Sequence, residues 1–325
     1  MALLDQSDVA EPASAGVIAP LVRLPGAPAP KVGAAEWFTG AGGAKLRAAL
    51  FPAAKPIGSV VISSGRTEFI EKYLEVCAEL VDRGYTVLIH DWRGQGLSQR
   101  LLPEPLMGHA AGYADFVADH AALLETFETR LPKPWFSLSH SMGGCLSMLV
   151  LAHGETRYSA AIFSAPMLGI KGFKPWLGRM IGGTMTTLGL SNSYGLGGAA
   201  DPFTATFESD ILTHDRTRYD RSRAYILADR DLALGAPTWG WIKSAFESVH
   251  WLHTAPDVTR IKTPITIVGA AEEKLVDNEG QKIVAGRIPG ARYLEIAGAY
   301  HEILMETDDI RAQFWAEFEA LVKRA

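Results

Sequence analysis

The sequence predicts an α/β fold in which a mostly parallel central sheet has helices on both faces and carries a helical cap insertion. Short apolar runs alternate with helix-patterned segments from about residue 58 to 164, and the alternation returns from about 264 to 325. Strands that alternate with helices indicate βαβ units, which build parallel sheets. With 48% hydrophobic and 21% charged residues in a chain of 325, the composition is globular and can supply a large core.

Each expected element follows from a local pattern. Strands are predicted from β-rich segments or continuous apolar runs over residues 36–50, 58–63, 85–90, 135–139, 159–164, 264–269 and 292–296. Helices are predicted where apolar residues recur at helical spacing, over 72–83, 113–130 and 141–153, with a final helix after residue 301. Gly84 ends the first of these helices, and Pro132 and Pro134 break the second.

The same pattern divides the chain into parts. Residues 1–34 are rich in Ala, Pro and Gly without a sustained period, which predicts an extended or partly disordered N-terminal arm. The alternation stops at about residue 166, and the segment 166–256 is rich in glycine, aromatic residues and helix signals. We therefore predict a core of residues 35–165 and 257–325, with 166–256 inserted over the sheet as a helical cap or lid.

Charge and cysteine content exclude several classes of protein. The formal net charge is −5 and no dense basic run occurs, so nucleic acid is not an expected partner. Cys77 and Cys145 are too few for a disulfide framework and lack the spacing of a zinc site, which favours a reducing compartment. The first 16 residues lack the basic start and apolar segment of a signal peptide, and no apolar stretch approaches the roughly 20 residues that span a bilayer. We expect a cytoplasmic protein whose membrane contact, if any, is peripheral and at the inner face.

A candidate nucleophile follows the strand predicted over 135–139. That strand runs into SHSMGG at 139–144 and then into a helix, which is the context of a nucleophile elbow. Small residues at both flanks suit a strained turn that lifts Ser141 to the carboxyl edge of the sheet, where the helix dipole favours negative charge. Ser139 stands where the usual GxSxG pattern has its first glycine. An ordinary tight turn is the alternative, and a base and an acid farther along the chain favour the elbow.

His301 is the candidate base. It lies in GAYHEIL, just after the strand predicted over 292–296 and before the final helix, so it belongs to the same carboxyl edge as Ser141. A neutral imidazole there could take the serine proton. The other eight histidines lie within or beside core elements, or in helices and loops without this placement at the end of a strand.

The acid should follow the preceding strand, in the chain order Ser, acid, His. The loop after residues 264–269 contains Glu272, Glu273 and Asp277. Glu273 is favoured because the residues after it give the acid, any residue, apolar, apolar pattern expected where the chain turns back into the fold. Counting from Gly269 would instead favour Glu272, and Asp277 suits an N-cap of the next helix.

An oxyanion hole needs backbone N–H donors aimed at the substrate carbonyl oxygen. Met142, directly after the candidate nucleophile, is expected to supply one donor. The second is expected from the loop 64–67 after the strand over 58–63, with the Arg66 N–H as the candidate. The side chain of Arg66 has two interpretations, which are contact with an anionic head group and a surface ion pair.

With these motifs the sequence resembles the α/β-hydrolase family, in its lysophospholipase and monoacylglycerol lipase branch, over about residues 36–325. The resemblance rests on five motifs in the family's order: SGRTEFIEKY, HDWRGQGLS, SHSMGG, AAEEKLVDN and GAYHEIL. The last three are most similar to the bacterial lysophospholipase subgroup, and this similarity implies a serine esterase without a cofactor. The sequence departs from the family at two places, because Ser64-Gly65 replaces the His-Gly of many relatives and Glu273 replaces the commoner Asp.

The insertion contains the candidate substrate-binding residues. Basic and aromatic residues intermix over 171–190, which suits a membrane-surface segment or a lid over an acyl pocket, and equally a cap helix packed on the core. The large apolar faces of Trp239, Trp241 and Trp251 could line a chain-binding pocket, with packing as the alternative. Trp176, Met180 and Trp239 are the chosen candidates for contact with the substrate. The charged run over 213–223 favours a salt-linked cap helix over a substrate site.

Three functions are compatible with the sequence. The first is hydrolysis of a lysophospholipid or monoacylglycerol, in which Ser141 attacks the ester, His301 shuttles the proton and Glu273 orients His301. The second uses the same machinery on small esters or aminoacyl amides, because the triad does not select the acyl chain. The third is a ligand-binding module without turnover, whose signature would be a missing triad residue, and all three residue types are present here. The two enzyme readings imply a small-molecule lipid or ester partner, and no feature assigns an oligomeric state.

Overall fold

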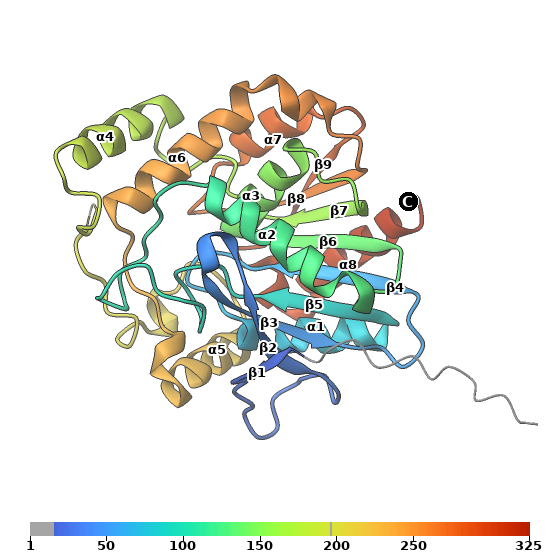
Figure 1. The fold of residues 1–325 in the computed structure, drawn as a ribbon. Helices are drawn as coiled ribbons and strands as arrows, with labels where there is room; N and C mark the ends of the chain where they lie inside the picture. The colour runs from blue at the N-terminus through green and yellow to red at the C-terminus, as the bar shows by residue number, and fades with distance from the viewer. Residues whose placement is uncertain (1–15, 196) are drawn as a thin grey trace, which may run out of the picture.

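The computed structural model describes residues 16–195 and 197–325, and within these ranges the chain forms one nine-stranded sheet flanked by helices (Figure 1). The strand order is β1-β2-β3-β5-β4-β6-β7-β8-β9. The strands are β1 (Val17–Ala19), β2 (Ala34–Thr39), β3 (Lys45–Phe51), β4 (Gly58–Ser63), β5 (Tyr85–His90), β6 (Trp135–His140), β7 (Tyr158–Ser164), β8 (Ile265–Ala270) and β9 (Arg292–Ile296). Neighbours from β5 to β9 are parallel, whereas the pairs β1–β2, β2–β3 and β3–β5 are antiparallel. The predicted mostly parallel sheet is confirmed.

The helices form two layers and an insertion. One face of the sheet is covered by α1 (Leu74–Asp82) and α8 (Asp308–Val322), and the other by α2 (Ala114–Phe127), α3 (Ser141–Ala152) and α7 (Asn278–Arg287). The insertion contributes α4 (Pro175–Thr187), α5 (Arg216–Ala228) and α6 (Trp239–Thr254). Short 3-10 helices within the described ranges are η1 (Ala41–Gly43), η2 (Ile70–Tyr73), η3 (Glu128–Arg130), η4 (Phe207–Ser209), η5 (Arg230–Leu232), η6 (Pro256–Arg260) and η7 (Ile303–Met305).

The central strands are buried on both faces. Val61 of β4 packs in the cluster with residues of α2 and α3, while its neighbours Val60 and Ile62 pack with residues of α1 and α8. Successive side chains of a strand point to opposite faces, so a strand covered on both sides must be apolar throughout. This arrangement explains why continuous apolar runs located these strands in the sequence.

The N-terminal region differs in part from the sequence prediction. The β-rich segment 36–50 is two antiparallel strands, β2 and β3, joined through Gly42 and Gly43, whose φ angles are 66° and 80°. Glycine adopts these left-handed angles without steric cost, which allows the chain to reverse here. Of the expected arm, residues 1–15 lie outside the described residues, whereas β1 pairs with β2 at the edge of the sheet.

A buried ion cluster ties the N-terminal strands to the loop ahead of α1. Arg47 of β3 donates two hydrogen bonds of 2.8 Å to Glu71 and one of 2.7 Å to Asp91. All three side chains are fully buried. Asp91 also accepts the backbone N–H of Ile70 at 2.9 Å. Because removing one member would leave an unpaired buried charge, the cluster holds the loop after β4 firmly against β3 and β5.

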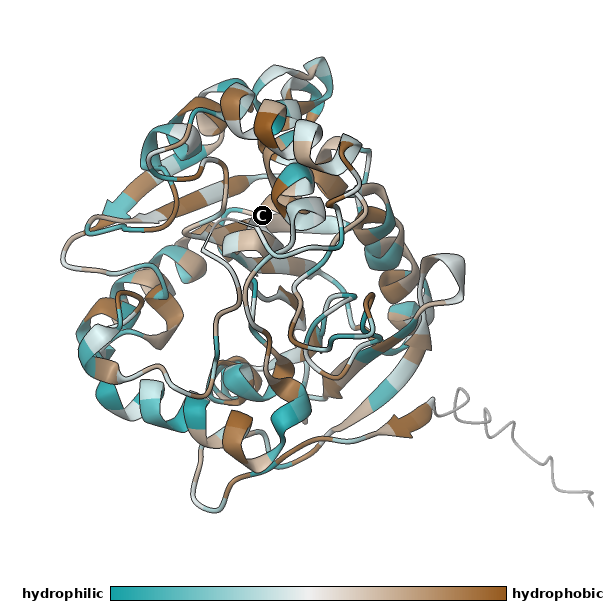
Figure 2. Ribbon diagram, turned by 90° about the vertical axis from the view of Figure 1, so that its left-hand side faces the viewer, coloured by the Kyte–Doolittle hydropathy of each residue, from teal (hydrophilic) through white to brown (hydrophobic). Residues whose placement is uncertain are grey.

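The insertion lies over the carboxyl edge of the sheet, at the left in Figure 1. Its helices α4 and α6 approach closely because α4 presents glycines to α6. A Cβ atom on Gly178 would lie 2.4 Å from the ring of Phe246, and one on Gly182 would lie 2.9 Å from the Cα atom of Lys243. Figure 2, which faces this side of the molecule, shows apolar and polar residues intermixed on the helices there.

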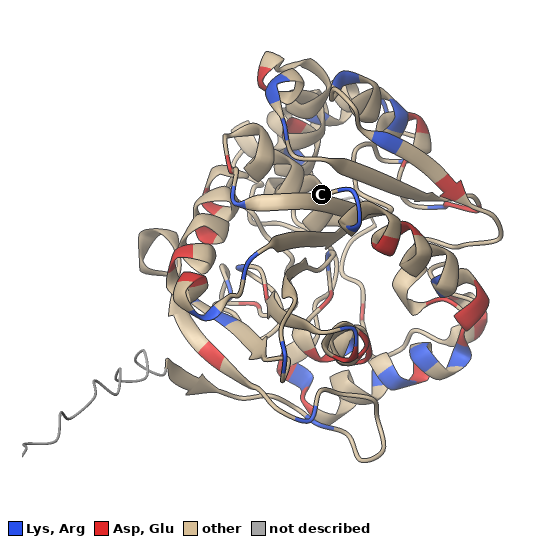
Figure 3. Cartoon of the chain, turned by 90° about the vertical axis from the view of Figure 1, so that its right-hand side faces the viewer, with Lys and Arg blue, Asp and Glu red and all other residues tan. Residues whose placement is uncertain are grey.

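Charges of both signs mix on the opposite side of the molecule. Figure 3 shows Lys and Arg interspersed with Asp and Glu along the helices that are visible from that side. Arg311 of α8, for example, pairs with Glu79 of α1 at 2.6 Å. This ion pair joins α8 to α1, the two helices that cover one face of the sheet.

Candidate active site

Ser141 occupies a strained turn between β6 and α3. Its φ angle is 50°, in the left-handed region that non-glycine residues rarely adopt. A Cβ atom on Gly143 would lie 2.3 Å from the carbonyl oxygens of Ser63 and Ser64, so the turn admits no larger residue there. Ser139 fits in place of the usual glycine because its hydroxyl is hydrogen bonded within the core, at 2.9 Å to Ser147 Oγ. The local geometry is that of a nucleophile elbow.

The structure brings Ser141, His301 and Glu273 into one hydrogen-bonded chain. His301 Nε2 lies 2.9 Å from Ser141 Oγ, and His301 Nδ1 lies 2.7 Å from Glu273 Oε2. The three residues are at most 9% exposed. The carboxylate accepts the Nδ1 proton, which leaves Nε2 free to accept the proton of the Ser141 hydroxyl. The three residues therefore have the geometry of nucleophile, base and orienting acid.

The loop after β8 fixes the Glu273 carboxylate. Its Oε1 atom accepts backbone N–H groups of Lys274 and Leu275, each at 2.8 Å, and of Val276 at 3.3 Å. Burial alone would raise the pKa of Glu273, but the hydrogen bond and charge of His301, with the backbone N–H groups, hold it below its ordinary value. Of the two alternative acids, Glu272 is exposed and Asp277 accepts the N–H of Glu279 as the N-cap of α7.

The two candidate oxyanion donors lie beside Ser141. Arg66 and Met142 both line the cavity that contains Ser141 Oγ. Met142 is the second residue of α3, where N–H groups have no intrahelical acceptor. The loop before Arg66 runs against the nucleophile, since a Cβ atom on Gly65 would lie 3.1 Å from Ser141 Cβ. The Gly65 N–H itself is bonded to Glu68 Oε2 at 2.5 Å, which leaves the next N–H, that of Arg66, for a substrate oxygen.

A cavity of about 270 Å³ opens at the candidate nucleophile. Its apolar wall consists of Met167, Ile170, Leu212, Trp241, Leu275 and Val276. Its polar wall holds Ser141 and His301 together with Arg66, His140, Glu68 and Glu302. An apolar pocket with a few convergent polar groups is the usual form of a small-molecule site.

The structure does not place Trp176, Met180 or Trp239 in the wall of this cavity. Trp176 and Met180 lie on the outer side of α4 and are 57% and 55% exposed. Trp239 is buried at the start of α6, and of the three tryptophans considered from the sequence it is Trp241, not the chosen Trp239, that lines the cavity. Residues two positions apart on an α-helix are rotated by about 200° around its axis, so Trp239 and Trp241 face opposite ways. Only the docking of α6 on the core decides which of them meets the cavity.

A buried charge cluster borders the polar wall, and it was also missed. Lys72 Nζ lies 3.0 Å from Glu68 Oε1 and 2.5 Å from Glu302 Oε1. Burial would raise the pKa of Glu68, but the charges of Lys72 and His140 and the Tyr73 hydroxyl lower it to about 2. These residues come from the loop after β4, from η2, from the end of β6 and from the loop after His301, so the fold is needed to bring all of them together. The motif SGRTEFIEKY contains Glu68, Lys72 and Tyr73, but no pattern in the sequence linked it to Glu302.

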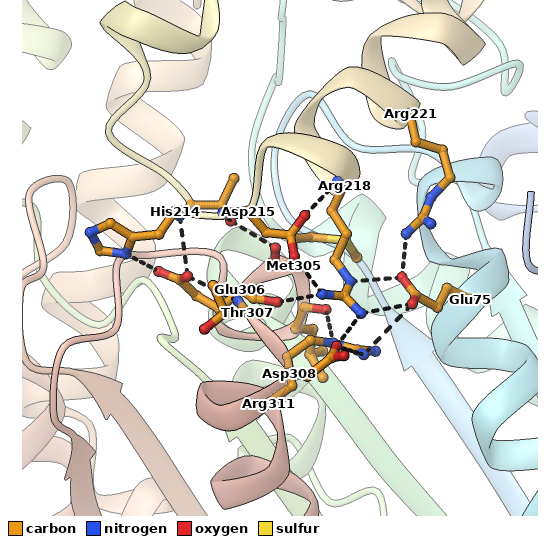
Figure 4. Close-up of polar contacts among 12 residues, drawn as sticks. Glu75, His214, Asp215, Arg218, Arg221, Met305, Glu306, Thr307, Asp308 and Arg311 are labelled. Atoms are coloured by element: carbon orange, nitrogen blue, oxygen red, sulfur yellow. Dashed lines mark hydrogen bonds and ion pairs between the residues drawn. The ribbon is translucent and has the colours of Figure 1, made fainter.

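The charged run over 213–223 forms the salt-linked helix that was predicted (Figure 4). Arg218 of α5 pairs with Glu75 of α1 at 2.8 Å, with Asp215 at 2.8 Å and with Asp308 at 2.6 Å. Next to this cluster, Glu306 accepts His214 Nδ1 at 2.8 Å. The same Glu306 oxygen accepts the N–H of Tyr300 at 2.9 Å, one residue before His301. The cluster therefore fastens the insertion to the loop that carries the candidate base.

Fold and site together define a class. A mostly parallel sheet with a serine elbow at its carboxyl edge, under a helical insertion, is the architecture of the α/β hydrolases. A family model described as serine aminopeptidase, S33, matches residues 54–308. The chain belongs to this family and to the lysophospholipase and monoacylglycerol lipase branch of the α/β hydrolases, a branch of ester hydrolases.

Two curated relatives match most of the chain. Lysophospholipase L2 of Escherichia coli strain K12 is 35% identical over 291 residues, which cover 85% of this chain and 83% of the relative. The probable lysophospholipase L2 of Haemophilus influenzae is 30% identical, over 78% of this chain and 79% of the relative.

Solved structures share the fold at lower identity. A soluble variant of monoglyceride lipase from Saccharomyces cerevisiae, in complex with a substrate analog, aligns with a TM-score of 0.65 at 18% identity, over 90% of this chain and 97% of that one. The monoacylglycerol lipase of Paleococcus ferrophilus aligns with a TM-score of 0.66 at 19% identity, over 86% and 99% of the two chains.

Proposed function

We propose that this protein hydrolyses the acyl ester of a lysophospholipid or monoacylglycerol through an acyl-enzyme on Ser141. The observation that carries the proposal is the hydrogen-bonded chain from Ser141 through His301 to Glu273, placed at a largely apolar cavity. The two curated relatives, which are named as lysophospholipases, support a lipid substrate.

In the first half-reaction, Ser141 Oγ attacks the ester carbonyl carbon while its proton passes to His301 Nε2. The oxyanion that forms accepts the N–H groups of Arg66 and Met142. When the tetrahedral intermediate collapses, the ester C–O bond breaks and the Nε2 proton passes to the departing glycerol oxygen. The acyl group is then bound to Ser141, and Glu273 holds His301 in the tautomer that accepts a proton.

Water completes the second half-reaction. His301 Nε2 takes a proton from a water molecule as its oxygen attacks the acyl-enzyme carbonyl. The second tetrahedral intermediate releases the fatty acid, and the proton returns to Ser141 Oγ. This cycle consumes one water molecule and uses no redox chemistry, and the side chains that carry it out all belong to this chain.

The cavity wall supports an acyl substrate. Met167, Trp241 and Leu275 are among the apolar residues that face the space next to Ser141. Burial of a methylene group contributes about 0.8 kcal/mol, so a wall of this kind favours longer acyl chains over acetyl groups.

The test is a chain-length series. Wild-type protein and Ser141→Ala would be assayed with p-nitrophenyl esters from acetate to palmitate, and with lysophosphatidylcholine and monoacylglycerol. We expect turnover that depends on Ser141 and rises with chain length. Turnover of short esters alone would identify a general esterase, and no turnover by the folded protein on any substrate would refute the proposal.

We further propose that α4 and the segment before it contact a lipid surface. Phe173, Trp176 and Met180 are 42%, 57% and 55% exposed, and Lys174 and Arg179 lie beside them in the sequence. An exposed apolar face with basic flanks suits an interfacial helix. Among the described residues, no helix combines the length and apolar character that crossing a bilayer requires.

Vesicle sedimentation tests this surface. Trp176→Ser/Met180→Ser is expected to weaken binding to vesicles that contain anionic lipid, while turnover of soluble p-nitrophenyl butyrate stays near the wild-type value. Leu227→Ser, on α5, is the control, because Leu227 is 60% exposed and lies on another helix. Equal binding by wild type and the α4 double variant would contradict the proposal.

A further inference from the structure

Arg66 lines the cavity at Ser141, and its guanidinium group, which lies over the ring of the cavity residue Trp241, has no carboxylate partner among the described residues. Its Nη2 atom donates to the backbone carbonyl oxygen of Gly235 at 2.5 Å. Its Nε atom is buried and has no hydrogen-bond partner. Among residues 16–195 and 197–325, no acidic group forms a salt bridge with Arg66. The surface ion pair that the sequence left open is therefore absent from the described part of the chain.

The two carboxylates that share the cavity wall do not neutralise this charge. Both form salt bridges with Lys72 instead, because Lys72 Nζ lies 3.0 Å from Glu68 Oε1 and 2.5 Å from Glu302 Oε1. Burial lowers the pKa of the Arg66 guanidinium to about 10, with no opposing charge to raise it. The group stays protonated at neutral pH, and an unpaired buried cation of this kind favours an anionic ligand.

We propose that the Arg66 guanidinium binds the phosphate of the substrate's head group, so that lysophospholipids are preferred over monoacylglycerols. The inference rests on the proposed function and narrows its substrate class. A guanidinium offers several N–H donors in a planar fork that matches the oxygens of a phosphate. Arg66 Nη1 makes no hydrogen bond within the described residues and is the donor left for a phosphate oxygen, whereas Nε is buried.

The position of Arg66 relative to the scissile ester fits this role. Its backbone N–H is the candidate donor to the ester oxyanion, and its guanidinium lies 5.1 Å from the ring centroid of Trp241, which lines the same cavity. In a glycerol-based lysophospholipid, the phosphate is separated from the acyl ester only by the glycerol carbons. One residue can therefore contact both groups, with the backbone at the ester and the side chain at the phosphate of the departing alcohol.

A purely structural role is the competing explanation. Arg66 also lies over the ring of Trp241, 5.1 Å from its centroid, and its bond to Gly235 joins the loop after β4 to the insertion. Loss of these contacts to Trp241 and Gly235 would reduce the turnover of every substrate equally. Loss of a phosphate contact would lower only the turnover of substrates that carry a phosphate.

The experiment compares substrates with one acyl chain and different head groups. Wild type, Arg66→Gln and Arg66→Lys would be assayed with palmitoyl lysophosphatidylcholine, palmitoyl lysophosphatidic acid and monopalmitoylglycerol. Arg100→Gln is the matched control, because Arg100 donates to the carbonyl oxygens of Asp231 and Ala233 in the same part of the insertion without lining the cavity. Circular dichroism and thermal unfolding would verify that each variant is folded.

For Arg66→Gln we expect the preference for phosphate, measured as kcat/KM on each phosphate-containing lipid divided by kcat/KM on monopalmitoylglycerol, to fall roughly 10- to 100-fold, as lost charge-assisted hydrogen bonds predict. Arg66→Lys should retain part of the preference, and Arg100→Gln all of it. An equal loss on all three lipids, or wild-type turnover of monopalmitoylglycerol alone, would overturn the inference while the proposed ester hydrolysis stands. No turnover of any lipid by wild type would overturn both.

A binding measurement separates recognition from turnover. Ser141→Ala and Ser141→Ala/Arg66→Gln would be titrated with a short-chain lysophosphatidic acid below its micelle concentration. We expect the double variant to bind roughly 10-fold more weakly or worse, with a smaller salt dependence. Equal affinity for the two proteins would refute a phosphate contact.

Discussion

The imidazole rings of His140 and His301 lie with their centroids 4.8 Å apart. Burial lowers the pKa of His140 to about 4, although the nearby Glu68 carboxylate opposes the change, and His140 Nδ1 lies 3.0 Å from the carbonyl oxygen of Ser164. His140 is therefore neutral at physiological pH. A neutral neighbour matters because His301 becomes positively charged during the proposed reaction, and a second cation at this distance would oppose that step.

Buried neutral histidines predict a loss of stability on acidification. The pKa values of His120 and His140 are about 4 in the folded protein because of burial, against about 6.5 in an unfolded chain. Between these values the unfolded state binds more protons, so the free energy of unfolding decreases as the pH falls. We expect a loss of about 2 kcal/mol per histidine between pH 7.5 and pH 5.

Urea unfolding at a series of pH values measures this loss. His120→Gln removes one of these titrating groups, so its unfolding free energy should fall less steeply with pH than that of wild type. If the two proteins gave parallel curves, buried neutral His120 would not be a source of the acid sensitivity.

The adjacent glutamates 272 and 273 provide a matched test of the acid. Glu273→Gln keeps the shape of the side chain but removes the charge that sets the His301 tautomer, so kcat should fall roughly 10³- to 10⁴-fold. Glu272→Gln should retain near wild-type kcat, because Glu272 is exposed and makes no contact with His301. Ester hydrolysis under saturating substrate gives both values. A similar small effect from both substitutions would remove Glu273 from the proposed triad.

Local patterns predicted much of this site because its main residues follow strand ends. Ser141, His301 and the loop of Glu273 come directly after β6, β9 and β8, and parallel strands bring their carboxyl ends to one edge. The conformation of the loop distinguishes Glu273 from Glu272, because three backbone N–H groups of the loop bind the Glu273 carboxylate.

The cavity wall could not be predicted in the same way. Trp241 faces the cavity and Trp239 does not, because the rotation of α6 about its axis depends on how the insertion docks on the core. Likewise, Lys72 meets Glu302 across 230 positions of sequence. Contacts between distant segments of this kind leave no periodic signal in the chain.

Replacement by alanine is expected to have opposite effects on stability at two glycines, Gly143 at the elbow and Gly286 in α7. Gly143→Ala would place a methyl group 2.3 Å from two backbone oxygens, so we expect a loss of about 1–3 kcal/mol in unfolding free energy and a displaced Ser141. Gly286→Ala, in α7, meets no atom within 4 Å and should stabilise the protein by about 0.5–1 kcal/mol. Denaturant unfolding together with esterase assays reads out both effects. A fully stable and active Gly143→Ala protein would show that the turn tolerates a side chain.

The ion cluster of Figure 4 predicts that two arginines on one helix differ greatly in importance. Arg218 is 9% exposed and pairs with Glu75, Asp215 and Asp308, so Arg218→Met removes these pairs and should cost about 1–3 kcal/mol, because Glu75 keeps its pair with Arg221. Arg216 is 62% exposed, and its pairs with Glu208 and Asp220 lie in solvent, so Arg216→Met should change stability by less than about 1 kcal/mol.

Because Arg218 donates to the carbonyl oxygen of Glu306, whose side chain accepts the N–H of Tyr300 next to His301, loss of Arg218 should also reduce turnover. We therefore expect Arg218→Met to lower kcat even at temperatures where the variant is fully folded, whereas Arg216→Met keeps the wild-type kcat. Thermal unfolding and initial rates at one low temperature separate the two effects. Unchanged kcat in a destabilised Arg218→Met protein would mean that the cluster holds the insertion in place without positioning His301.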